Sequence, residues 1–251
     1  MLERGNRAHD GLHDPPACLT LSTALPRTLQ TYTVSNQQWA KTMTVFLYNG
    51  PEDARVTCLL AHGAGAPMDS DFMNTMADLL GERHCRVARI EFPYMALRRT
   101  EGGRRPPPRA ERLTEAYKEA VGDLDNPEKL IIGGKSFGGR VASMIADELH
   151  TAGQVAGLVC LGYPFHPPGK SDKLRTGHLR ELTCPTLICQ GTRDPFGGSA
   201  EITAYDLSPA IRFHWAEDGD HDLAPRKSSG HTKAGNWRAA ADAIQDFAMQ
   251  L

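Results

Sequence analysis

From Val56 onward, short apolar runs alternate with amphipathic stretches. Apolar residues run almost without interruption through VTCLLAH, KLIIGG, VAGLVCLGYP and PTLICQG, as is typical of strands that are buried on both faces. Between them, apolar positions recur every three or four residues, most clearly in the last segment as Trp237, Ala240, Ile244 and Phe247. Strands that alternate with helices predict a mainly parallel sheet with helices on both faces, which is the α/β class.

The same pattern predicts the elements in chain order. We expect strands at 43–48, 56–62, 86–92, 129–134, 155–164, 185–191 and 211–215. We expect helices at 70–83, 111–124, 137–150 and 198–207, followed by a terminal helix. Residues 93–109 are rich in Pro, Gly and Arg and predict a loop, and residues 165–183 predict a small flap in place of a large cap. Residues 1–27 show no period and predict a disordered arm before a single domain at 28–251.

Composition narrows the function classes. The 251 residues carry 28 Lys and Arg against 30 Asp and Glu, a net charge of −2, which does not support nucleic-acid binding. No apolar run reaches the roughly 18 residues of a membrane-spanning helix, and the first residues show no secretory signal pattern, so we expect a cytoplasmic protein without a membrane partner. The six cysteines form no C-x-x-C pair, which favours small buried thiols over a disulfide framework.

The clearest chemical motif is Gly134-Lys135-Ser136-Phe137-Gly138, a G-x-S-x-G pentapeptide. A predicted strand precedes it and a predicted helix follows it, which is the context of a nucleophile elbow. In such an elbow the serine lies on a strained turn, and the flanking glycines allow close backbone approach. Without that context a glycine-rich turn would be an equally good interpretation. With it, we predict that Ser136 is a nucleophile.

A serine nucleophile needs a base and an acid that orients the base. Asp194 follows the strand PTLICQG, and His221 lies in the loop after the last predicted strand. Both would lie at the edge of the sheet where parallel strands place their sites. Taken singly, Asp194 reads as a turn-capping residue and His221 as an exposed loop histidine. Together, in the order Ser, Asp, His, the three predict a catalytic triad.

An oxyanion hole is expected beside the elbow. The strand VTCLLAH ends in the small residues of Gly63-Ala64-Gly65, whose backbone N–H groups can face a developing negative charge. The second donor would be the N–H of Phe137, directly after the nucleophile. His62 has no second metal ligand at i+2 or i+4. We therefore expect it to form structural hydrogen bonds, and we expect neither a metal nor a cofactor.

The segments LLAHGAGAPMDSDFM, FPYMALRRTEGGRRPPPR, GGKSFGGRVAS, GTRDPFG and DGDHDL together resemble the α/β-hydrolases. More narrowly, the chain from about Thr44 resembles the dienelactone-hydrolase-like family of bacterial predicted hydrolases, whose relatives include a testis-expressed protein and a chromatin-complex scaffold subunit. The resemblance implies Ser136 as nucleophile, Asp194 as acid and His221 as base, with Ala64 and Phe137 as oxyanion donors. Dienelactone hydrolase itself uses cysteine where this chain has serine, so dienelactone substrates are not implied.

Two basic features leave alternatives open. The segment 93–109 carries Arg98, Arg99, Arg104, Arg105 and Arg109. These arginines either bind an anionic substrate or belong to a solvated surface loop. Lys135, beside the nucleophile, either favours anionic acyl groups or is a solvent-facing or internally paired lysine.

These observations predict a serine hydrolase that cleaves a small-molecule carboxylic ester or thioester through an acyl-enzyme. A peptidase or amidase with the same triad is one alternative. A non-catalytic interaction scaffold that binds a protein partner is another, although a scaffold would have no need of all three triad residues.

Overall fold

The computed structural model describes residues 44–103 and 105–251. The arm predicted at 1–27, the residues up to Met43 and Arg104 lie outside this described part. Within it, seven strands form one sheet in the order β1-β3-β2-β4-β5-β6-β7. The strands are β1 (Phe46–Asn49), β2 (Val56–Ala61), β3 (Cys85–Ile90), β4 (Lys129–Lys135), β5 (Gly157–Leu161), β6 (Thr186–Gly191) and β7 (Ile211–Ala216). Only β1, at one edge, pairs in the antiparallel sense among these strands, which confirms the predicted α/β fold class.

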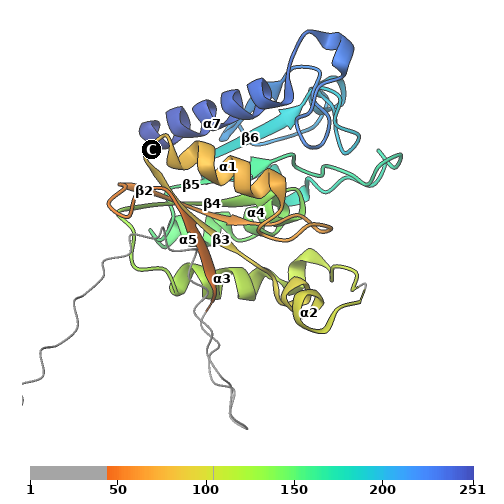
Figure 1. The fold of residues 1–251 in the computed structure, drawn as a ribbon. Helices are drawn as coiled ribbons and strands as arrows, with labels where there is room; N and C mark the ends of the chain where they lie inside the picture. Colours follow the sequence, from red (N-terminus) through yellow and green to blue (C-terminus); the bar gives the residue numbers. More distant parts are fainter. Residues whose placement is uncertain (1–43, 104) are drawn as a thin grey trace, which may run out of the picture. The chain divides into compact units, whose positions relative to one another are not determined.

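Helices cover both faces of the sheet (Figure 1). The helices of the described part are α1 (Asp71–Gly81), α2 (Pro93–Glu101), α3 (Thr114–Gly122), α4 (Phe137–Ser143), α5 (Ala146–Thr151), α6 (Ser199–Ile202) and α7 (Lys233–Gln250). One apolar cluster packs α1 and α7 on one face, and a second packs α3, α4 and α5 on the other. The central strands contribute alternate side chains to the two clusters, which explains why their sequences are continuously apolar. None of the described helices is long and apolar enough to cross a bilayer.

Two sequence predictions were wrong about helices. Residues 93–109 were expected as a loop, but their first nine residues form α2. Pro93 occupies the first turn, where its missing N–H costs nothing, and good helix formers follow it. The helix expected at 137–150 is broken into α4 and α5, because the Ser143 hydroxyl donates to the Arg140 carbonyl at 2.8 Å and the next turn tightens.

The other boundaries moved by a few residues. The strand expected at 155–164 ends at Leu161, since Gly162 turns the chain with a φ of 68°. The helix expected at 198–207 is only the short α6. Between β5 and β6 the structure has a single 3₁₀ turn, Gly177–Leu179, so this segment forms no cap domain.

The topology decides where polar loops meet. From β2 the chain adds β3 on one side, whereas β4 adds on the other side of β2. The carboxyl ends of β2 and β4 are therefore neighbours at the point where the strand order reverses, the usual position of a binding crevice in such sheets. Ala61 pairs in register with Gly134. The chain leaving β2 and the pentapeptide leaving β4 consequently lie side by side.

Candidate active site

Ser136 occupies a strained turn between β4 and α4. Its φ of 50° and ψ of −109° lie outside the regions that L-residues favour, and such a conformation costs on the order of 1–3 kcal/mol. The neighbouring glycines are required by close packing. A Cβ at Gly134 or Gly138 would lie 2.3 or 2.4 Å from the Ala61 carbonyl oxygen. The turn predicted from the pentapeptide is therefore present, with the serine at its tip.

The structure brings Ser136, His221 and Asp194 together at the carboxyl edge of the sheet. The His221 Nε2 atom lies 2.8 Å from Ser136 Oγ. On the other side of the ring, His221 Nδ1 lies 2.8 Å from Asp194 Oδ2. The ionised carboxylate can only accept, so the Nδ1 proton points to Asp194 and Nε2 is left to accept the serine proton. The Phe196 ring lies 4.2 Å from the imidazole, centroid to centroid.

Asp194 is held by partners that the sequence analysis did not single out. Its side chain is fully buried. Gln190 Nε2 donates to Oδ2 at 2.9 Å, and the Phe196 backbone N–H donates to Oδ1 at 2.8 Å. Gln190 is completely buried within β6, so the one amide side chain of this mainly apolar strand was the available signal. Because both carboxylate oxygens accept hydrogen bonds, the acid is fixed in orientation.

Two backbone N–H groups are candidates for an oxyanion hole. Within the described residues, no oxygen accepts a hydrogen bond from the N–H of Ala64 or of Phe137. A Cβ at Gly63 would lie 3.9 Å from the Ser136 Cβ, so the loop after β2 packs against the elbow. The Tyr94 hydroxyl donates to the Ala64 carbonyl at 3.1 Å and so holds the loop after β2 from the α2 side. The arrangement suits two N–H groups that face a developing oxyanion.

His62 is a buried structural residue. Its Nδ1 lies 2.6 Å from the Gly63 carbonyl oxygen, and its Nε2 accepts from the Phe92 N–H at 3.1 Å. Both ring nitrogens are thus used by the backbone of neighbouring loops, and burial lowers the pKa of the imidazole. Within residues 44–103 and 105–251, no group of His, Cys, Asp and Glu side chains is arranged to hold a metal ion.

Two of the arginines expected as substrate ligands are paired with carboxylates. Arg99 binds Glu91 at 2.8 Å and Asp69 at 2.7 Å, and these bonds raise its pKa. Arg105 pairs with Glu101. Arg98, on α2, has no ion-pair partner among the described residues, and Arg104 lies outside them. Arg109, which is exposed, also has no ion-pair partner among the described residues. Of the predicted set, Arg98 and Arg109 therefore keep guanidinium groups that are free to meet an anion.

Lys135 does not face the solvent. It is only 7% exposed, and its Nζ donates to the His221 carbonyl at 2.6 Å. Of the interpretations left open, the internally paired lysine is the one that agrees with this geometry.

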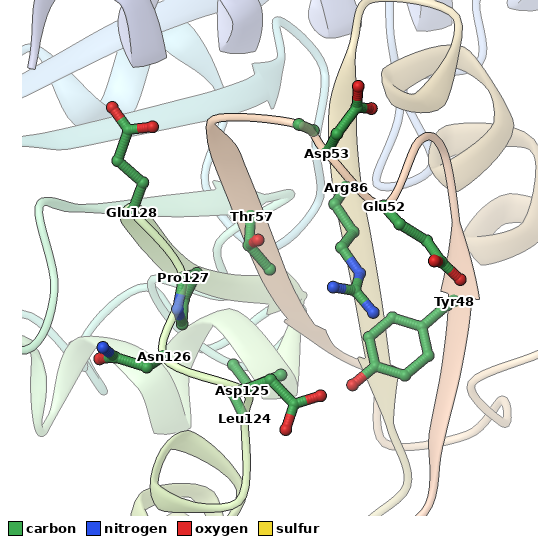
Figure 2. A pocket seen from close by; sticks show the side chains of 11 residues that line it. Tyr48, Glu52, Asp53, Thr57, Arg86, Leu124, Asp125, Asn126, Pro127 and Glu128 are labelled. Carbon is green, nitrogen blue, oxygen red and sulfur yellow. The ribbon is translucent and has the colours of Figure 1, made fainter.

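A separate cavity of about 210 Å³ lies at the opposite edge of the sheet, where β2, β3 and β4 begin. Figure 2 shows the Arg86 guanidinium beside the Tyr48 ring, 4.5 Å from its centroid, with the carboxylate of Asp125 nearby. None of the candidate catalytic residues lines this cavity. The cavity and the Ser136 site are thus distinct features of the fold.

Comparison with known proteins gives one family and many similar folds. The family described as an alpha/beta hydrolase domain matches residues 54–249. Dienelactone hydrolase from Anabaena variabilis is 22% identical, with a TM-score of 0.59, over 81% of this chain and 89% of that one. An α/β serine hydrolase without a lid from Xanthomonas campestris is 15% identical, with a TM-score of 0.58, over 85% and 98%.

A serine hydrolase involved in carbazole degradation is 16% identical to this chain, with a TM-score of 0.60, over 83% of this chain and 95% of its own. At such low identities the likeness establishes the fold, and it leaves the reaction of this chain to be argued from its own residues.

Proposed function

This chain belongs to the alpha/beta hydrolase domain family, and we propose that it is a serine hydrolase that cleaves a carboxylic ester or thioester of a small molecule. The observation that carries the proposal is the hydrogen-bonded series from Ser136 Oγ through His221 to Asp194, with 2.8 Å at each contact. A nucleophile, a base and an orienting acid within hydrogen-bond reach are the recurring requirements of acyl transfer by serine.

In the first half of the reaction, His221 Nε2 accepts the Ser136 proton as Oγ attacks the substrate carbonyl carbon. Asp194 holds the imidazole in the tautomer with Nδ1–H and stabilises the imidazolium that forms. The N–H groups of Ala64 and Phe137 donate to the oxyanion. Loss of one such donor typically lowers turnover by about 10²–10³-fold. The imidazolium then returns its proton to the departing alcohol or thiol, which leaves an acyl group on Ser136.

In the second half, a water molecule takes the place of the leaving group. His221 accepts a proton from it, the hydroxide oxygen attacks the acyl carbon, and Ser136 recovers its proton as the acid departs. Similar folds include a dienelactone hydrolase and an esterase domain from Rhodothermus marinus, which supports an ester as the scissile bond. The short segment between β5 and β6 suits a substrate that reaches Ser136 without passing under a cap.

The test is labelling of the purified protein with a fluorophosphonate, which captures activated serines, followed by mass spectrometry of the modified peptide. We expect the label on Ser136, and Ser136→Ala should abolish it. Turnover of p-nitrophenyl esters should fall by up to about 10⁶-fold in the same variant. A parallel panel of thioesters and anilides separates the ester and thioester reaction from that of an amidase.

Ser143 provides the matched control, because its Oγ also lies 2.8 Å from a histidine nitrogen, that of His178. Ser143→Ala should leave labelling intact. Absence of label on folded wild-type protein would overturn the proposed function and favour an interaction scaffold.

A further inference from the structure

Lys135, the last residue of β4, is a buried cation in contact with the loop that carries His221. Its Nζ donates to the His221 carbonyl at 2.6 Å and lies 3.1 Å from Asp222 Oδ1. The same ammonium lies 5.2 Å from the centroid of the Phe72 ring, on α1. Gly162 leaves room for this contact, since a Cβ there would lie 3.1 Å from Nζ and 2.7 Å from the His221 carbonyl oxygen.

The charges around Lys135 explain how it remains in this position. Burial lowers its pKa, and the carboxylates of Asp222, Asp194 and Asp220 act in the opposite direction. Asp222 belongs to the same loop as His221, so the ion pair adds a second contact between β4 and that loop. A buried ammonium that makes both a hydrogen bond and an ion pair is compensated, which a buried cation requires.

Because of its position in the chain, Lys135 connects the turn at Ser136 with the loop that carries His221. Lys135 directly precedes Ser136 in the chain. The backbone of this segment therefore positions Ser136, and the side chain of Lys135 holds the carbonyl of His221. Other bonds to the loop come from α7, where Trp237 donates to the Asp222 carbonyl and Asn236 to the Leu223 carbonyl. Those bonds fix the loop to the scaffold, whereas Lys135 fixes it to the elbow.

We propose that Lys135 is a positioning residue, which sets the distance between Ser136 Oγ and His221 Nε2 by binding the His221 carbonyl. The proposal rests on the proposed function, and it assigns the lysine beside the nucleophile to the enzyme's own base instead of to an anionic substrate. Because a displacement of about 1 Å in a reacting group can lower a rate about 10²-fold, loss of this bond should act on turnover more than on binding.

The test compares Lys135→Met with Lys129→Met. Lys129 lies at the other end of β4, and its Nζ also donates to a backbone carbonyl, that of Ala248, at 3.1 Å. With p-nitrophenyl butyrate as the probe, Lys135→Met should lower kcat by about 10- to 100-fold and change KM by less than about threefold. Fluorophosphonate labelling of Ser136 should slow by a similar factor. Lys129→Met should behave as wild type.

Hydrogen exchange provides a readout that does not depend on chemistry. Backbone amides of residues 217–224 should exchange faster in Lys135→Met than in wild type. Their exchange rates in Lys129→Met should equal those of wild type. Asp222→Asn keeps the bond to the His221 carbonyl, removes the counter-charge at an exposed position, and should lower kcat by a smaller factor. If Lys135→Met does not fold, the lowered kcat of Asp222→Asn still tests the contact between Lys135 and the loop.

A rise in KM with kcat unchanged in Lys135→Met would overturn the proposal in favour of substrate binding. Unchanged exchange at 217–224 would overturn it as well. If wild-type protein took no label and cleaved no ester, the proposed function would fail, while faster exchange in Lys135→Met would still support the anchoring of the loop.

Discussion

Among the residues that the structure describes, two serine–histidine pairs have the same separation, but their hydrogen bonds run in opposite directions. Ser136 Oγ and His221 Nε2 are 2.8 Å apart, as are Ser143 Oγ and His178 Nε2. In the second pair, the Ser143 hydroxyl donates to the Arg140 carbonyl at 2.8 Å. Its oxygen can then only accept from His178, so Nε2 carries the proton there. In the first pair, Asp194 holds the proton on Nδ1, and Nε2 accepts.

The two pairs therefore differ in which atom carries the shared proton, and not in the distance between serine and histidine. His178 lacks a carboxylate within hydrogen-bond reach among the described residues, and Ser143 is a helical residue with 2% exposure. Ser136 has the strained backbone, the free neighbouring N–H groups and the acid. Asp194→Asn, Ser143→Ala and His178→Gln each alter one of these differences.

Among the variants that alter these differences, Asp194→Asn should have the largest effect, because it makes the hydrogen bonding of the first pair resemble that of the second. A neutral amide neither fixes the tautomer of His221 nor stabilises its imidazolium, so turnover of p-nitrophenyl butyrate should fall by about 10⁴-fold. Both carboxylate oxygens of Asp194 accept hydrogen bonds, from Gln190 and from the Phe196 N–H. In the variant, the NH₂ group of the asparagine would therefore face a donor. Steady-state kinetics and circular dichroism check the rate and the fold. A loss of less than tenfold with the fold intact would contradict the role of the acid.

The sequence was sufficient to predict the fold class, the strained turn at Ser136 and the approach of Asp194 and His221. These follow from local patterns. A glycine-flanked serine between a strand and a helix forms one kind of turn, and polar residues after parallel strands meet at one edge of the sheet.

Pairings across the fold could not be predicted in the same way. Arg99 is bound by Asp69, which lies 30 residues away in the chain, and Lys135 by a carbonyl 86 residues away. Nothing in the composition of 93–109 distinguishes an arginine that is neutralised by a distant carboxylate from one that is free. The break between α4 and α5 has a local cause instead, since the Ser143 hydroxyl donates to a carbonyl only three residues earlier. The continuous helical spacing of apolar residues through 137–150 conceals it.

A smaller effect is expected from Ser143→Ala, which removes the second pair and leaves the first untouched. The free energy of unfolding should fall by about 1 kcal/mol, since a buried hydrogen-bonded hydroxyl is lost. The rate of fluorophosphonate labelling should equal that of wild type. Urea denaturation and timed labelling are the two measurements. A labelling rate lowered by tenfold or more would indicate that the two pairs are coupled through α4.

The smallest effect is expected on the pH dependence of the free energy of unfolding, to which His178 contributes. Burial lowers the pKa of its imidazole below the ordinary 6.5, nearby Arg140 lowers it further, and Asp147 and Glu111 oppose this. Between the folded and unfolded pKa values the unfolded chain binds more protons, so this histidine reduces stability as pH falls below about 6.5.

His178→Gln retains an N–H donor for Ser143 and removes the titration. In urea denaturation at pH 7.5, 6.5 and 5.5, the variant should therefore lose less stability on acidification than wild type. The difference should be about a few tenths of a kcal/mol, because solvent screens a partly exposed group. His62 and His214, whose pKa values burial also lowers, contribute the same slope to both proteins. Equal slopes would mean that His178 is protonated in the fold without penalty. Its Nδ1–H would then have an acceptor, and the contrast with His221 would rest on the serine alone.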